Sequence, residues 1–227
     1  MSLAHSLRLL LAPPHRAARP FLVGGAVVAI GGGLLAGPWL FWPGALFTAF
    51  CLYFFRDPER VTPRRPRILV APADGRVVSV AEAAPPAELG LGDAPRWRVA
   101  IFLSVLDVHV NRAPCDGRIL RIAYRRGAFL NASLDKASEL NERNAIAIRL
   151  PDGRDVAVVQ IAGLVARRIL CDVAEDQVVQ AGERIGIIRF GSRTDLYLPP
   201  GVKPLVLEGQ TMIGGETVIA ELPPIRA

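Results

Sequence analysis

The alternation of hydrophobic and polar positions divides the chain into two parts. Residues 21–55 contain no charged side chain, whereas after Pro66 short β-branched runs alternate with polar turns. The uncharged run exceeds the roughly 20 apolar residues of one membrane-spanning helix and is short for two. Gly37-Pro38 and Pro43-Gly44 interrupt it near the middle, where a helix kinks or turns. The pattern predicts an apolar helical membrane hairpin inside an N-terminal segment of residues 1–66.

The basic residues lie on both sides of this apolar run. Residues 1–20 carry three arginines and no acid, residues 56–67 carry five arginines and two acids, and residues 68–227 have no net charge. Because cytoplasmic flanks of membrane segments are rich in basic residues, both flanks are expected on the cytoplasmic side of the cell membrane. A hairpin that spans or dips into the bilayer satisfies this expectation. A single kinked span and a buried helix pair are the alternatives, whereas a cleaved signal peptide has a shorter apolar core.

The charge and cysteine distributions also limit the classes of partner and compartment. A nucleic-acid-binding protein would carry its basic excess on the folded domain, so this class is excluded. The arginines of residues 56–67 are instead expected to attract an anionic lipid surface. Three widely spaced cysteines give neither a disulfide framework nor a C-x-x-C metal motif. A reducing compartment is the simplest interpretation.

Residues 67–227 have the pattern of a β-rich domain. Asp-Gly pairs at 74–75, 116–117 and 152–153 supply turns. The segments PADGRVV, APCDGRIL and VQAGERIGIIRF resemble the half-barrel strands of barrel-sandwich hybrid domains. We therefore predict a mostly β (α+β) fold, a compact β sandwich or barrel. The expected strands are 68–70, 77–80, 98–103, 146–150, 156–161 and 185–190, with a loop at 81–96 and helices only at 134–142 and around 165–170.

Histidine is scarce in the predicted β-rich domain. His109 is its only histidine, and the sequence has no P-loop, G-x-G-x-x-G or G-x-S-x-G motif. No metal site is therefore expected. Taken alone, His109 in FLSVLDVHVNRAP is most simply a strand-end residue whose side chain is satisfied. It is also the one side chain of this domain that titrates near neutral pH. Because the sequence contains serine, histidine and aspartate residues, a Ser–His–Asp hydrolase is not excluded by composition.

The segment RIGIIRFGSRTDLYLP, residues 184–199, carries the most chemical information. A predicted strand runs directly into Gly191-Ser192, and a second strand-like run ends at Pro199. A hairpin turn is the ordinary use of a Gly-Ser pair. The pair also suits N→O acyl transfer, in which the serine hydroxyl attacks the preceding glycine carbonyl in a strained turn. Elimination from the resulting ester and hydrolysis of the dehydroalanine leave a pyruvoyl group.

Five motifs in order carry a resemblance to a known family. Together they resemble the short form of phosphatidylserine decarboxylase, over about residues 50 to 222. The motifs are FFRDPER (54–60), PADGRV (72–77), FLSVLDVHVNRAP (102–114), NERN (141–144) and RFGSRTDLYLP (189–199). The resemblance implies a catalytic domain, 67–227, of a proenzyme that cuts itself between Gly191 and Ser192. A β chain of residues 1–191 would stay with an α chain of residues 192–227.

The family's chemistry implies roles for individual residues of this chain. Ser192 would become a covalent pyruvoyl group that forms a Schiff base with the substrate, and no metal or diffusible cofactor would be needed. The reaction converts phosphatidylserine at a membrane surface to phosphatidylethanolamine and CO₂ in phospholipid biosynthesis. His109 is the expected proton donor. Longer members of the family carry a second histidine in the motif that contains His109, and an Asp–His–Ser relay through it is held to drive self-cleavage. Asp74 and Ser192 match this relay, but Arg112 stands where the second histidine would be, so the group that deprotonates Ser192 is open. Whether the protein forms a higher oligomer is also open.

Two other classes of function compete with this interpretation. One is a non-catalytic, membrane-anchored barrel-sandwich scaffold or adaptor, which leaves FGSRTDLYLP unexplained. No lysine lies at a carrier-type turn, since Lys136 and Lys203 are the only lysines in the chain. The other is a membrane-tethered serine hydrolase that uses Ser192. An intact chain would indicate a scaffold or hydrolase, whereas a blocked internal N-terminus would indicate a decarboxylase.

Overall fold

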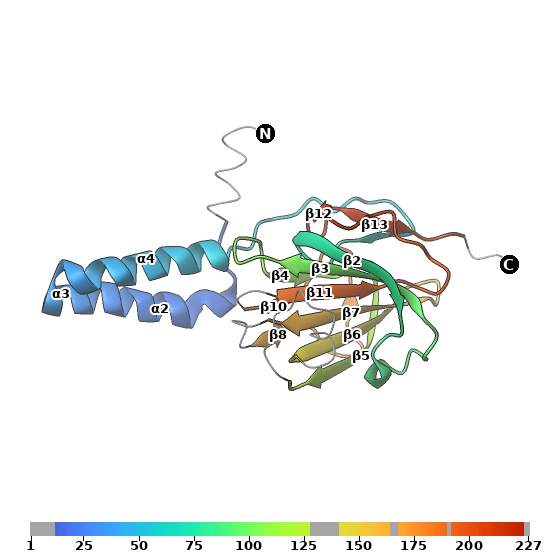
Figure 1. Ribbon diagram of the computed structural model, residues 1–227, viewed down its shortest axis with the longest axis horizontal. Helices are drawn as coiled ribbons and strands as arrows, with labels where there is room; N and C mark the ends of the chain where they lie inside the picture. The colour runs from blue at the N-terminus through green and yellow to red at the C-terminus, as the bar shows by residue number, and fades with distance from the viewer. Residues whose placement is uncertain (1–11, 128–140, 164–167, 190–191, 225–227) are drawn as a thin grey trace. The chain divides into compact units, whose positions relative to one another are not determined.

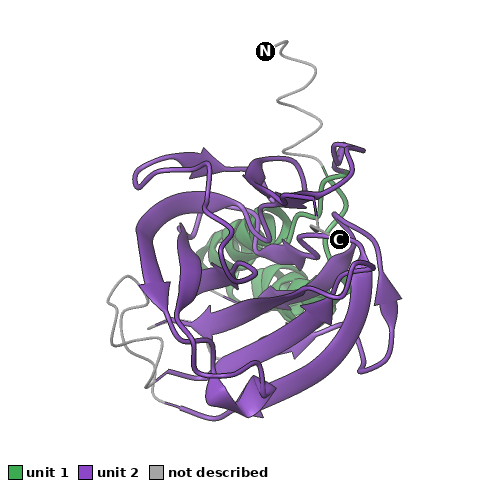
Figure 2. Ribbon diagram, turned by 90° about the vertical axis from the view of Figure 1, so that its right-hand side faces the viewer, with its two compact units in different colours: residues 1–59 green, residues 60–227 purple. Residues whose placement is uncertain are grey.

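The computed structural model describes residues 12–127, 141–163, 168–189 and 192–224. The chain divides into two compact units, residues 1–59 and residues 60–227 (Figure 2). This division falls a few residues before the boundary at residues 66 and 67 expected from the sequence.

Unit 1 is a hairpin of two apolar helical arms (Figure 1). The first arm runs without a break through η1 (Arg16–Ala18), α2 (Arg19–Val27), the π-helical η2 (Val28–Gly32) and α3 (Gly33–Ala36). Gly37 ends it at φ +67°, a left-handed conformation that favours glycine. The second arm, α4 (Pro38–Phe54), returns beside the first. The hairpin expected from the sequence is thus present, and it turns at Gly37-Pro38.

The second interruption expected in the apolar run does not break the helix. Pro43 and Gly44 both lie inside α4, near its beginning. A proline this close to a helix start removes one backbone hydrogen bond and leaves the rest of the ladder intact. Gly44 instead allows close packing, because a Cβ there would collide with the backbone of Ala29 on the first arm.

Unit 2 is built from antiparallel strands in three sheets. An eight-stranded sheet has the order β12-β2-β3-β11-β7-β6-β5-β9, a three-stranded sheet the order β4-β10-β8, and β1 pairs with β13. Figure 2 shows the largest sheet curling into a half-barrel. The strands are β1 (Ile68–Val70), β2 (Gly75–Ala83), β3 (Arg96–Leu103), β4 (Val110–Arg112), β5 (Gly117–Arg125), β6 (Arg143–Arg149), β7 (Asp155–Ala162), β8 (Ile169–Cys171), β9 (Val178–Val179), β10 (Arg184–Ile188), β11 (Ser192–Tyr197), β12 (Thr211–Met212) and β13 (Val218–Glu221).

The hydrophobic core of unit 2 lies on one face of the large sheet. Alternate residues of its strands, such as Val99 and Ile101 of β3 and Val158 of β7, pack there against β1 and β13 side chains such as Leu69 and Ile219. This alternation is the period of two that places every second side chain on one face. The mostly β fold class is confirmed.

Two local predictions differ from the structure. Residues 169 and 170, expected at the end of a helix, lie in β8, because Ile169 and Leu170 pair with Ile188 and Ile187 of β10. Sheet pairing here overrides a local helical pattern. The expected helix at 134–142 falls outside the described residues except for Asn141 and Glu142, which are not helical. Residues 81–96 include the last residues of β2, the short η3 (Ala87–Leu89) and the start of β3.

Candidate active site

Ser192 is the first residue of β11, in the middle of the large sheet. Its ladder partners are Leu103, the last residue of β3, and Ala162, the last residue of β7. β3 and β7 run antiparallel to β11, so both of these strands terminate at the end of the sheet where β11 begins. We call this end of the domain the Ser192 end. Gly191, the predicted cleavage partner, lies outside the described residues.

The Ser192 side chain is fully buried. Its hydroxyl oxygen has no hydrogen-bond partner within the described part of the chain. Ala162, its ladder partner, packs with Ile169 and Ile188 in a small hydrophobic cluster. A buried hydroxyl without a partner is costly and rare, and such groups call for a functional explanation.

His109 immediately precedes β4 and is also fully buried. Its Nδ1 lies 3.0 Å from the carbonyl oxygen of Asp107. Because a carbonyl only accepts, Nδ1 carries a proton, and Nε2 is the nitrogen that gains or loses one. The Ile188 amide donates to the His109 carbonyl at 3.3 Å. The Nδ1 contact orients the imidazole, and the backbone hydrogen bond joins His109 to β10.

A chain of buried amides connects the strand after His109 to the strand of Ser192. Asn144 Nδ2 donates to Gln160 Oε1 at 2.9 Å, Gln160 Nε2 donates to Asn111 Oδ1 at 2.8 Å, and Asn111 Nδ2 donates to Thr194 Oγ1 at 3.3 Å. His109 lies two residues before Asn111, and Ser192 lies two residues before Thr194. The Asn111–Thr194 hydrogen bond therefore joins the strand that follows His109 to the strand that begins at Ser192.

Asp74 directly precedes β2, whose Arg76 pairs with Phe102 of β3, so it also lies at the Ser192 end. Its carboxylate accepts from Arg60 Nη2, 2.7 Å from the nearer oxygen, and from the Gly214 amide at 2.8 Å. Burial raises the pKa of Asp74, the charge of Asp107 raises it further, and the Arg60 and Gly214 contacts only partly offset this. No described contact joins Asp74 or His109 to the Ser192 hydroxyl.

Arg112 occupies the place of the second histidine of longer relatives, and it is buried. Its Nη1 donates to the carbonyl of Gly182 at 2.9 Å, and its backbone amide donates to Pro72. A Cβ on Gly215 would lie only 2.9 Å from Arg112 Cδ. The arginine is therefore packed against loop backbone.

The residue after Ser192 projects to the opposite face of β11. Arg193 Nε donates to Asp195 Oδ1 at 2.6 Å, and Nη2 donates to Oδ2 at 2.9 Å. Both side chains are almost completely buried. Such a two-bond pair fixes the planar guanidinium rigidly, and because both residues belong to β11 it orders the start of this strand.

Sequence reasoning missed Arg60, Asp107, Asn111 and Thr194 at this end of the domain. Arg60 belongs to a basic run that was interpreted as a membrane flank, yet its side chain is buried against Asp74. Asn111 lies within the FLSVLDVHVNRAP motif and Thr194 within RFGSRTDLYLP. Their place inside the two motifs was the available signal.

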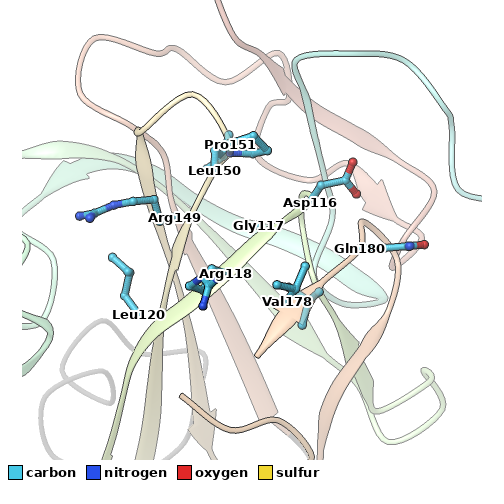
Figure 3. A pocket seen from close by; sticks show the side chains of 10 residues that line it. Asp116, Gly117, Arg118, Leu120, Arg149, Leu150, Pro151, Val178 and Gln180 are labelled. Atoms are coloured by element: carbon cyan, nitrogen blue, oxygen red, sulfur yellow. The ribbon is translucent and has the colours of Figure 1, made fainter. Parts of the chain in front are cut away.

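Two further features bear on the choice of site. Among the described residues, no group of three or more His, Cys, Asp or Glu side chains is arranged to hold a metal ion. A surface hollow of about 570 Å³ lies between β5, β9 and the turn after β6 (Figure 3). Arg118 and Arg149, in its wall, pair across the β5–β6 ladder at the end opposite Ser192. The hollow therefore contains none of the candidate residues.

Comparison with known proteins identifies the family. The phosphatidylserine decarboxylase family model matches residues 47–220. The phosphatidylserine decarboxylase proenzyme of Granulibacter bethesdensis is 71% identical over 99% of this chain and 91% of its own length. Those of Gluconacetobacter diazotrophicus and Gluconobacter oxydans are 64% and 62% identical, each over 98% of this chain and 100% of their own.

These matches define the class of protein to which the fold and the buried serine belong, a decarboxylase of the proenzyme type. The chain belongs to the phosphatidylserine decarboxylase family. The resemblance inferred from the five motifs is confirmed, and the non-catalytic scaffold is excluded.

Proposed function

We propose that the chain cleaves itself between Gly191 and Ser192 and then decarboxylates phosphatidylserine, as a step of phospholipid biosynthesis, through a pyruvoyl group derived from Ser192. One observation carries this proposal. Ser192 begins a central strand with a fully buried hydroxyl that has no partner in the described ranges. A structural serine in such a place would be hydrogen-bonded.

Self-cleavage uses only atoms of the chain. Ser192 Oγ attacks the carbonyl carbon of Gly191, and the amide bond is exchanged for an ester. Elimination across Cα–Cβ of Ser192 then frees the Gly191 carboxylate and leaves dehydroalanine. Hydrolysis releases ammonia and yields the pyruvoyl group at the head of residues 192–227. Because the Ser192 hydroxyl has no described hydrogen bond to break, its attack is not opposed by a competing contact.

The surroundings of Ser192 fit a small group of this kind. Leu103 and Ala162 flank it in the sheet, and the cluster of Ala162, Ile169 and Ile188 excludes water from one side. The pyruvoyl carbonyls supply the electron sink that breaking a Cα–carboxylate bond requires. The β3 and β7 ladders hold the new chain end in the sheet after cleavage.

His109 is our candidate for the proton donor to Cα of the substrate serine. With Nδ1 held by the Asp107 carbonyl, Nε2 is the atom that would deliver the proton. The amide chain through Asn111 and Thr194 keeps the strand of His109 in register with the strand of Ser192. General acids positioned in this way typically contribute about 10²–10⁴-fold to a rate.

Asp74 is our candidate for the processing step, acting on Ser192 through an intermediate group. Its raised pKa makes the ionised carboxylate a stronger base than an ordinary aspartate. A guanidinium donates hydrogen bonds and accepts none, so Arg112, whose Nη1 donates to the Gly182 carbonyl, is not a candidate for the base that a second histidine would provide.

We further propose that unit 1 anchors the enzyme in the cell membrane with the catalytic domain on the cytoplasmic side. By length and composition the helix Arg16–Ala36 can cross a bilayer, a criterion that signal sequences and core helices also meet. Its 21 residues span about 31 Å, close to the hydrocarbon thickness.

The packing of unit 1 supports insertion in lipid. Small residues face inward, since Gly25 and Gly44 approach Thr48 and Ala29 of the opposite arm, whereas Leu35 and Trp39 are 90% and 86% exposed. Small residues between helices and large apolar ones outside are typical of membrane helix pairs.

The two ends of the hairpin lie together. The amide of Asp57 donates to the Pro13 carbonyl and the amide of His15 to the Phe55 carbonyl. Arg16 and Arg56, one from each basic flank, therefore lie at the same end of unit 1, as a common cytoplasmic side requires. Arg60 is an exception to the expected lipid-facing arginines, because it is buried with Asp74.

The intact mass of the purified protein tests this proposal. We expect two chains, residues 1–191 and 192–227, which remain associated and act on phosphatidylserine. The second should resist Edman degradation and be lighter by one ammonia than a chain that begins with serine. An uncut chain, or an ordinary serine amine at residue 192, would contradict the proposal. The serine hydrolase alternative is disfavoured, because the chain belongs to a family whose members are named decarboxylases.

A further inference from the structure

A short turn connects β3 to His109 and presents two apolar side chains to solvent. The Ser104 amide donates to Asp107 Oδ2 at 2.8 Å, and the Asp107 amide donates back to the Ser104 carbonyl at 2.9 Å. This reciprocal pair fixes the turn. At its tip Val105 is 42% exposed and Leu106 is 66% exposed. We call residues 104–107 the apolar turn.

The apolar turn lies at the Ser192 end of the domain. It begins one residue after Leu103, the ladder partner of Ser192, and it ends two residues before His109. The side chains that reach solvent there therefore border the proposed reaction site on the side of β3. Val178 of β9 is equally exposed, at 65%, but it pairs with Arg118 at the opposite end of the sheet.

Two arginines lie at the same end of the domain. In the β8–β10 ladder Ile169 pairs with Ile188, and the next residues outward are Arg168 and Arg189, joined by a backbone hydrogen bond of 3.3 Å. Ile169 and Ile188 pack on Ala162, the other ladder partner of Ser192. Like charges directly opposite each other in a ladder are unfavourable. Burial and the charge of Arg168 lower the pKa of Arg189.

We propose that the Ser192 end of unit 2 docks on an anionic phospholipid bilayer, with Val105 and Leu106 inserted among the lipids and Arg168 and Arg189 against their phosphates. This inference rests on the proposed function, because it takes Ser192 as the place of reaction. An apolar tip flanked by cations is the combination that binds anionic membrane surfaces. The substrate is itself an anionic lipid of that surface. Docking at the Ser192 end brings the lipid headgroup to Ser192 while the acyl chains stay in the bilayer.

The test compares one enzyme on two forms of the same headgroup. Full-length enzyme is reconstituted into phosphatidylcholine vesicles and given either long-chain phosphatidylserine in the bilayer or short-chain phosphatidylserine dissolved below its micelle-forming concentration. The turn variant Val105→Ser/Leu106→Ser is compared with the control variant Val178→Ser. The variant Arg168→Gln is compared with the control variant Arg118→Gln, because Arg118 is an exposed arginine at the opposite end of the sheet. The single variant Leu106→Ser is used if the double variant does not fold.

We expect the turn variant to lower kcat/KM on bilayer phosphatidylserine by about tenfold or more, since losing even one buried apolar side chain is on the scale of tenfold, with no change on the dissolved lipid. Arg168→Gln should weaken the salt dependence of the bilayer reaction alone, and both control variants should behave as the wild type. A turn variant that keeps the bilayer rate, or that loses both reactions equally, would overturn the docking surface. A wild type that turns over neither form would instead contradict the proposed function.

Discussion

Asn111 Nδ2 donates a hydrogen bond to Thr194 Oγ1 across 3.3 Å, and both side chains are completely buried. Asn111 belongs to the three-stranded sheet and Thr194 to the large sheet. The other two amides lie within the large sheet, where Gln160 is the cross-strand neighbour of Thr194 and Asn144 is that of Gln160. Asn111 is thus the member that ties the strand of His109 to the strand of Ser192.

Asn111→Leu should disturb both stability and catalysis. Leucine has a similar volume, but it leaves Gln160 Nε2 and the Thr194 hydroxyl buried without this partner, at a cost of about 1–3 kcal/mol. A small displacement of His109 from Ser192 should lower kcat by roughly tenfold to a hundredfold with little change in KM. Thermal unfolding and steady-state kinetics measure the two effects.

Thr194 provides the control for this prediction. Thr194→Ser keeps the accepting hydroxyl and should resemble the wild type, whereas Thr194→Val should resemble Asn111→Leu. Because the two residues share one hydrogen bond, the double variant Asn111→Leu/Thr194→Val should lose less than the sum of the single losses. Full additivity would show that the contact does not couple the two strands.

Substitution of Ser192 separates self-cleavage from proteolysis. Ser192→Ala removes the attacking oxygen and should leave a single uncut, inactive chain of 227 residues. Ser192→Cys should still be cut slowly, through a thioester, since sulfur can replace oxygen as the nucleophile. Mass spectrometry of the purified variants distinguishes these outcomes. Efficient cutting of the alanine variant would assign the break to a protease.

His109→Ala is expected to uncouple the two reactions. Decarboxylation should fall by about 10²–10⁴-fold, the usual contribution of a positioned general acid, while residues 192–227 still appear as a separate chain. The amount of processed chain and the rate of CO₂ release are measured on the same sample, with circular dichroism as the folding control. A folded, processed variant with full activity would remove His109 from the mechanism.

The sequence predicted the elements that carry the site but not the contacts that complete it. Strands were expected on both sides of Gly191-Ser192, and β10 and β11 lie there. Local alternation predicts which residues share a face, but it does not select the neighbouring strands. The pairing of Ser192 with Leu103 and Ala162 was therefore not predictable from the pattern.

Arg60 and β8 illustrate the same limit in two ways. The arginine lies in a run that looks like a membrane flank, and only the folded domain brings it onto Asp74. Residues around 165–170 were expected to be helical, but Ile169 and Leu170 belong to a strand because β10 supplies their partners. Tertiary contacts between distant residues decided both cases. By contrast, the Gly37-Pro38 turn depends on local backbone chemistry and was predicted.

The pH dependence of processing should report the surroundings of Asp74. Burial raises the pKa of its carboxyl, Asp107 raises it further, and Arg60 lowers it. The ionised form is the proton acceptor, so processing should slow as the pH falls through this raised pKa. Cell-free synthesis at a series of pH values, followed by quantification of the cut chain, gives the midpoint.

Two variants should move this midpoint in opposite directions. Asp107→Asn removes the repulsion and keeps an oxygen for the Ser104 amide, so the midpoint should shift to lower pH. Arg60→Gln removes the attraction, so the midpoint should shift to higher pH. Shifts of the same sign, or none, would exclude Asp74 as the acceptor.

The packing of unit 1 predicts where its two arms can be joined covalently. A Cβ built on Gly25 lies 3.4 Å from Cβ of Thr48, close to the 3.5–4.5 Å of disulfides. In a chain whose three native cysteines are replaced by serine, Gly25→Cys/Thr48→Cys should therefore form an intramolecular disulfide in membranes, visible as a change in gel mobility that a reductant reverses.

Gly44→Leu in the same background should abolish that disulfide, because its side chain would collide with the backbone of Ala29 and force the arms apart. Gly31→Leu is the matched control, since a Cβ at Gly31 meets no atom within 4 Å. Membranes washed with high salt should retain all three proteins, because apolar burial rather than charge holds the anchor. Cross-linking that survives Gly44→Leu would show that the arms do not pack through this glycine, and release by salt alone would show that unit 1 is not inserted.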